Sequence, residues 1–176
     1  MLDMPQPGAA APDFQLPSTQ GALRLSDVTA AGKVLLAFYQ EDNTPLCSSE
    51  LSVLKEDYDL VRTLRAEVVG VSANGMEDHE KFARRLGGLP FPLVSDRDLE
   101  AARAYGVLDD GGRRSRRAVF IIDKGGTVLH VVPWFQPGNP VQYEEIFAAL
   151  GRIRVLVQAK GVGEPRLTGL RGGSNA

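Results

Sequence analysis

The chain has a single cysteine, Cys47, among its 176 residues. One thiol cannot close an internal disulfide, nor can it supply the several sulfur ligands of a zinc or iron–sulfur site. Disulfide-stapled secreted folds and cysteine-rich metal centres are therefore excluded. A strong charge of one sign is also missing, since 20 basic residues face 22 acidic ones. This balance gives no general attraction to nucleic acid or to an anionic membrane. We expect no nucleic-acid partner, no membrane partner and no cofactor.

Long apolar segments are missing as well. The first 12 residues contain no basic start followed by an apolar run, so they do not resemble a signal peptide. The longest apolar runs, such as residues 34–39, are far shorter than the roughly 20 residues that cross a bilayer. These features favour a soluble, cytoplasmic protein. With 43 % hydrophobic residues, the chain can still bury one sizeable core.

The hydrophobic pattern of the first half predicts a hairpin and then a βαβ unit. Two short alternating segments around a proline-glycine turn predict an N-terminal β-hairpin over residues 13–25. The continuous apolar run 34–39 predicts a central strand that is buried on both faces. Apolar residues then recur every three or four positions to about residue 65, which predicts an amphipathic helix. A second buried strand is expected at 67–72.

The second half predicts further helices and strands in one domain. We expect, in order, a helix at 76–86, a short strand at 91–94, a short helix at 98–105, an antiparallel hairpin at 118–132 and a closing helix at 141–157. This order predicts an α/β fold with a mixed central sheet and helices on both faces, over residues 1–157. Residues 158–176 are rich in glycine and poor in apolar side chains, so we expect a flexible tail there.

Cys47 falls close to the start of the first long helix. Thr44 is a good N-cap and Pro45 suits the first helical position, which places Cys47 in the first turn. The free backbone N–H groups and the positive end of the helix dipole favour a thiolate there. From these residues alone, a reactive thiol and an inert buried cysteine are both open interpretations.

Residues 38–51 resemble the active-site segment of the peroxiredoxins, the alkyl hydroperoxide reductase/thiol-specific antioxidant family. That pattern is Pro-x-x-x-Thr/Ser-x-x-Cys, followed by small residues and Glu. Residues 11–14, 91–96 and 117–123 are also similar to the family, in the right order. The likeness covers about residues 10–150 and is greatest to the bacterioferritin-comigratory type or a one-cysteine relative. It implies a thioredoxin-like fold.

The resemblance implies a role for each matched residue. Cys47 matches the peroxidatic cysteine, whose thiolate attacks a peroxide and becomes a sulfenic acid. Thr44 matches the hydroxyl that hydrogen-bonds the peroxide, and Arg117 matches the arginine that stabilises the thiolate and the departing oxygen. The backbone N–H groups of Leu46 and Cys47 would donate to the peroxide oxygens. Glu50 matches an acidic residue that helps orient arginines, and a solvated helix position is its alternative interpretation.

Two positions depart from the family pattern. Gln40 stands where the family has a proline that shields the cysteine, and Ser52 stands where the comigratory type often has a resolving cysteine. Because no second cysteine exists, we predict a one-cysteine mechanism. The sulfenic acid would react with the Cys47 of another chain or with an external thiol, which could be thioredoxin, glutaredoxin or a low-molecular-weight thiol. A monomer and a homodimer are both open.

The sequence therefore predicts a thiol-dependent peroxidase for hydrogen peroxide or small organic hydroperoxides. Two alternatives remain open, a thioredoxin-like thiol-transfer protein and a non-catalytic binding or chaperone module of the same fold. Two polar segments have no predicted chemistry. The basic run 113–117 is interpreted as a solvated loop, apart from Arg117, and residues 77–80, which include His79, are interpreted as a solvated helix start.

Overall fold

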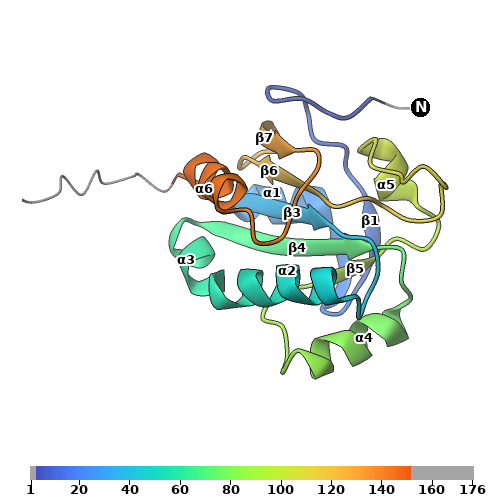
Figure 1. The fold of residues 1–176 in the computed structure, drawn as a ribbon. Helices are drawn as coiled ribbons and strands as arrows, with labels where there is room; N and C mark the ends of the chain where they lie inside the picture. The colour runs from blue at the N-terminus through green and yellow to red at the C-terminus, as the bar shows by residue number, and fades with distance from the viewer. Residues whose placement is uncertain (1–2, 152–176) are drawn as a thin grey trace, which may run out of the picture.

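A computed structural model describes residues 3–151 of the chain (Figure 1). Within this range one seven-stranded sheet is formed by β1 (Gln15–Ser18), β2 (Gly21–Arg24), β3 (Lys33–Phe38), β4 (Ala66–Ser72), β5 (Leu93–Ser95), β6 (Ala118–Ile122) and β7 (Val128–Val132). The helices in this range are α1 (Leu25–Ala31), α2 (Pro45–Glu56), α3 (Tyr58–Thr63), α4 (Met76–Arg85), α5 (Glu100–Ala104) and α6 (Pro140–Ala149). The expected tail at 158–176 and the expected helical residues 152–157 lie outside the described residues.

The strands form a mixed sheet in the order β2-β1-β5-β4-β3-β6-β7. The neighbours β3, β4 and β5 run parallel to one another, whereas β1 and β6 are antiparallel to the strands beside them. The predicted hairpins correspond to β1–β2 and β6–β7. Strand β3 pairs on both of its edges and is covered on both faces, which explains its continuous apolar sequence.

Helices cover both faces of the sheet, as predicted. Alternate side chains of β3 enter two separate cores: Leu35 packs into the core on the side of α2, α3, α4 and α6, and Leu36 into the core on the side of α1 and α5. Figure 1 shows α2 and α4 on the near side of the sheet and α1 behind it. The carboxyl end of β3 leads through the short loop 39–44 into α2, so the start of α2 lies at the edge where the parallel strands end.

Two local predictions about helices were wrong. The helix expected to reach about residue 65 is interrupted at Asp57, so that α2 and α3 are separate. The apolar spacing continues across the break because Leu54 and Val61 still enter the same core, which is why periodicity did not reveal it. Helix α1 was not predicted, since its first residue, Leu25, looked like the end of the hairpin strand.

None of the helices within residues 3–151 combines the length and the apolar character that a bilayer span requires.

Candidate active site

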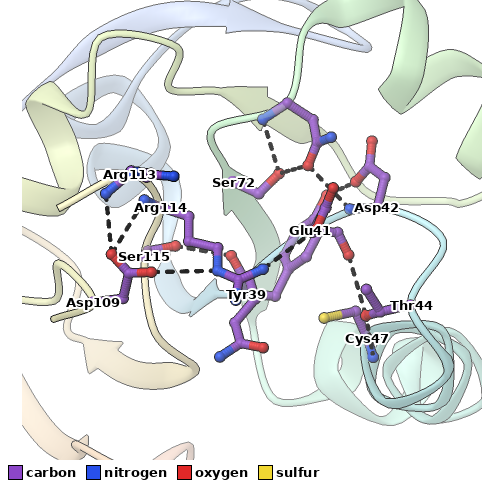
Figure 2. Close-up of polar contacts among 12 residues, drawn as sticks. Tyr39, Glu41, Asp42, Thr44, Cys47, Ser72, Asp109, Arg113, Arg114 and Ser115 are labelled. Atoms are coloured by element: carbon purple, nitrogen blue, oxygen red, sulfur yellow. Dashed lines mark hydrogen bonds and ion pairs between the residues drawn. The ribbon is translucent and has the colours of Figure 1, made fainter. Parts of the chain in front are cut away.

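The start of α2 has the predicted capping geometry. Thr44 is the N-cap with extended backbone angles, and Pro45 takes the first helical position. Thr44 Oγ1 accepts a hydrogen bond from the backbone N–H of Cys47 over 3.3 Å (Figure 2). The hydroxyl in turn donates to the carbonyl oxygen of Glu41, also over 3.3 Å. The cap therefore fixes the Thr44 side chain beside Cys47 and uses the Cys47 N–H that we expected to face a peroxide.

The Cys47 side chain is completely buried. Its exposed fraction is 0 %, and it belongs to the core that contains Leu35, Ala37 and Leu51. Cys47 is nevertheless in the first turn of α2, whose backbone N–H groups have no earlier helical carbonyl to bond, so that the Thr44 hydroxyl accepts from the Cys47 N–H instead. Because the exposed fraction is 0 %, neither a peroxide nor a thiol can contact the sulfur until the residues around the start of α2 move.

Arg117 reaches the same loop from a distant part of the chain. It immediately precedes β6, and the pairing of Phe38 with Ala118 brings the end of β3 next to the start of β6. Arg117 Nη1 donates to Gln40 Oε1 over 3.2 Å. Its Nε is buried without a hydrogen-bond partner among the described residues. Within those residues no hydrogen bond joins the guanidinium to Thr44 or Cys47, so Gln40 is its link to the loop.

Glu50 lies one helical turn after Cys47 and is also completely buried. Neither of its carboxylate oxygens has a hydrogen-bond partner within residues 3–151. Burial raises the pKa of Glu50 to about 8, although the positive charge of Arg117 opposes this rise. The solvated alternative for Glu50 was therefore wrong. At neutral pH the structure favours an uncharged carboxylic acid close to the arginine.

A buried polar cluster beside the site was missed by the sequence analysis. His79 of α4, expected to be solvated, is completely buried. Its Nδ1 lies 2.8 Å from Asp42 Oδ2, and Tyr39 donates to Asp42 Oδ1 over 2.7 Å. The three acidic neighbours of His79 along the chain, Glu77, Asp78 and Glu80, are indeed exposed. A lone histidine among acids gave no sign of partners that lie about 40 positions earlier in the chain.

The basic run folds back against the loop that precedes α2. Arg114 pairs with both Glu41 and Asp109, each over 3.3 Å (Figure 2). Ser115 Oγ donates to the carbonyl oxygen of Tyr39 over 2.8 Å. Arg116 stacks over the exposed ring of Trp134 at 4.3 Å from the ring centre. The run therefore does more than face solvent, because it ties a second loop to the residues before Cys47.

Within residues 3–151, no three His, Cys, Asp or Glu side chains are grouped so that they could hold a metal ion. The chemistry that the described site can perform is that of a thiol near a hydroxyl, a guanidinium and a neutral acid.

Comparison with known proteins agrees with this site and this fold. The model of the AhpC/TSA family matches residues 7–131. The peroxiredoxin bcp of Coxiella burnetii is 32 % identical over 132 residues, which cover 72 % of this chain and 87 % of that protein. Peroxiredoxin 2 of Picrophilus torridus is 33 % identical over 133 residues, covering 71 % of this chain and 64 % of that protein.

A solved structure supports the same assignment. The crystal structure of peroxidoxin BcpB from Mycobacterium tuberculosis superposes with a TM-score of 0.74 at 29 % identity, over 85 % of this chain and 99 % of that one. The fold is thus thioredoxin-like, with a mixed sheet between two layers of helices. The chain belongs to the AhpC/TSA family, the peroxiredoxins.

Proposed function

We propose that this peroxiredoxin reduces hydrogen peroxide and small organic hydroperoxides, with Cys47 as the peroxidatic cysteine. The observation that supports this most strongly is the placement of the chain's single cysteine in the first turn of α2, with Thr44 capping that turn. A helix N-terminus stabilises a negative charge on sulfur. Thr44, which caps this turn, would hydrogen-bond a bound peroxide.

The first half-reaction transfers one oxygen atom to the thiolate. The Cys47 sulfur attacks the terminal oxygen of the peroxide, so that an S–O bond forms while the O–O bond breaks. Sulfur is oxidised to a sulfenic acid, and the other peroxide oxygen leaves as hydroxide or alkoxide and takes up a proton to give water or alcohol. The fixed charge of Arg117 would stabilise the charge that develops on the departing oxygen.

The second half-reaction requires an external thiol. Since the chain has no second cysteine, the sulfenic acid cannot form an internal disulfide. One external thiol would displace water to form a mixed disulfide with Cys47, and a second would release the Cys47 thiol. Because Cys47 is completely buried, the start of α2 must open before that first thiol can react. The proposed reductants are thioredoxin, glutaredoxin and low-molecular-weight thiols. A cytoplasmic location and a monomeric or homodimeric state stay predictions.

One observation favours a second candidate, a non-catalytic module of the same fold. The complete burial of Cys47 is also what an inert core cysteine would show. Thiol transfer without peroxide is less favoured, because the position of the first thiol in a Cys-x-x-Cys pair is occupied here by Thr44.

A peroxide-consumption assay with a panel of thiol reductants tests the proposal. The wild-type protein should consume peroxide in proportion to its concentration when a suitable thiol is present. Cys47→Ser should abolish this consumption, whereas Ser49→Ala, a substitution at an exposed position two residues further on, should preserve it. Consumption that persists in Cys47→Ser would refute the proposal, and a wild-type protein inactive with every thiol would support the non-catalytic module.

A further inference from the structure

We propose that His79 is a positioning residue for the peroxidatic site, which holds the loop before α2 closed through Asp42. The inference rests on the proposed function, since it concerns how the site around Cys47 is kept in shape. Loop residues 39–44 join β3 to α2 and contain both Gln40, which holds Arg117, and Thr44, which caps the turn of Cys47. His79 lies on a different element, α4.

Asp42 is the buried anchor of this loop. Its two neighbours, Glu41 and Asn43, are exposed, whereas the side chain of Asp42 is 1 % exposed. The carboxylate accepts from Tyr39 and contacts His79, while the Asp42 backbone N–H donates to Asn74 Oδ1 over 3.0 Å. Asp42 therefore fastens the middle of the loop to the protein interior.

The partners of His79 suit a hydrogen-bond donor at each ring nitrogen. Nε2 lies 3.0 Å from the carbonyl oxygen of Val94, which can only accept, so Nε2 carries a proton. The single hydroxyl proton of Tyr39 points to Asp42, so the 3.3 Å contact between Tyr39 oxygen and Nδ1 is favourable when Nδ1 donates. A donating Nδ1 also suits the carboxylate at 2.8 Å. His79 thus supplies a hydrogen bond to the buried Asp42 carboxylate.

This arrangement makes the loop depend on His79. Without the imidazole, Asp42 would be left as a buried carboxylate with one side-chain donor, Tyr39. A buried charge that loses its partner is strongly destabilising, and the loop can relieve this by moving Asp42 out to solvent. Gln40 and Thr44 lie two residues before and after Asp42, so the same movement would displace both the holder of Arg117 and the cap of Cys47.

The His79→Gln variant tests this inference by two opposite changes. Alkylation of Cys47 by a bulky maleimide, measured without peroxide, should become at least about tenfold faster because the loop opens more often. Oxidation of Cys47 by hydrogen peroxide should become at least about tenfold slower because Thr44 and Arg117 are no longer held. Ile146→Ala, which weakens the same core from α6, controls for general destabilisation and should not reproduce this pair of changes.

Substitutions of Asp42 show whether His79 acts through it. Asp42→Ala should reproduce the His79→Gln behaviour, and adding His79→Gln to it should have little further effect. Asp42→Asn should retain most of the wild-type behaviour, since an amide can accept from Tyr39 and donate to a neutral His79 ring.

The outcomes separate this inference from the proposed function. Wild-type rates of both alkylation and oxidation in folded His79→Gln would overturn the inference, as would the same pair of changes in Ile146→Ala. If His79→Gln does not fold, Asp42→Ala compared with Asp42→Asn supplies the same test, and equal behaviour of those two variants would overturn it. A wild-type protein that does not react with peroxide would refute the peroxidase function but leave the alkylation test intact.

Discussion

Arg117 Nη1 donates a hydrogen bond to Gln40 Oε1 over 3.2 Å, and this contact joins the strand at one side of the site to the loop that precedes Cys47. Gln40 occupies the position at which the family pattern has a proline, and a proline side chain offers no acceptor. In this chain the departure from the pattern therefore supplies an oxygen that holds the guanidinium. The arginine is held in place by this neutral contact, with no ion pair to a described residue within 4.0 Å.

Gln40→Ala should slow the oxidation of Cys47 by peroxide about three- to tenfold, which corresponds to the loss of one hydrogen bond that positions a charged group. Stopped-flow measurement of the peroxide step gives this rate. The matched control is Gln15→Ala, which removes a Gln–Arg hydrogen bond of the same kind, to Arg24, in the N-terminal hairpin. An unchanged rate in Gln40→Ala would show that the contact does not position Arg117.

Arg117→Lys should slow the same step by about ten- to a hundredfold. Lysine keeps the positive charge but loses the planar fork that can hold Gln40 and a peroxide oxygen together. Arg103→Lys is the control, because Arg103 also donates from its guanidinium to an oxygen, the carbonyl of Asp98, but lies on α5 at the other face of the sheet. If Arg117→Lys reacted with peroxide as fast as the wild type, the guanidinium of Arg117 would have no role in the proposed site.

Thr44→Val should weaken both the cap and the chemistry. Loss of the cap hydrogen bond to the Cys47 N–H should lower the free energy of unfolding by about 1 kcal/mol, measured by urea denaturation. The peroxide step should fall about tenfold or more, because no hydroxyl remains to hold the substrate. Thr44→Ser retains the oxygen and should restore most of both quantities. If Thr44→Val lost stability but reacted with peroxide normally, Thr44 would be a cap and nothing more.

Glu50 should make the protein less stable as the pH rises. Below about pH 4.5 the carboxyl is protonated in both the folded and the unfolded chain, so it has no effect on the difference between them. Between there and about pH 8 the unfolded chain loses the proton while the folded chain keeps it. Unfolding is favoured across this range, by a contribution on the order of 4 kcal/mol.

Urea denaturation at pH 5 and pH 8 measures this contribution. Glu50→Gln cannot ionise, so its free energy of unfolding should fall less than that of the wild type between the two pH values. The change in the free energy of unfolding between the two pH values is compared, and not its absolute value, because a buried amide without partners lowers stability at every pH. Glu80→Gln, at an exposed position, should behave like the wild type. Parallel pH dependence in Glu50→Gln and the wild type would contradict the neutral buried acid.

Much of the fold could be predicted because the sequence carries direct signals for it. The run that forms β3 is apolar at every position after Lys33, which is the pattern of a strand covered on both faces. Thr44 and Pro45 marked the start of α2 to the residue. The break at Asp57 had no such signal, because the residues on both sides of it face one core.

The site was only partly predictable, for a physical reason. Cys47 and Thr44 are neighbours along the chain, so the local rules of helix capping bring them together. The surroundings of Glu50 and the partners of His79 depend on segments that meet only in the folded protein. Arg117 immediately precedes β6, and Asp42 lies in the loop after β3. Local pattern cannot show which polar residue is buried when its partners are distant in sequence.

The central claim is that the Cys47 sulfur itself takes an oxygen atom from the peroxide. Mass spectrometry of the reduced protein after one equivalent of hydrogen peroxide, without added thiol, tests this most directly. We predict the gain of one oxygen atom per chain, located at Cys47 by peptide mapping and removed by a subsequent thiol, with no gain in Cys47→Ser. Two results would contradict the account. In one, peroxide is consumed while Cys47 of the wild type stays unmodified, and in the other, the wild type consumes no peroxide.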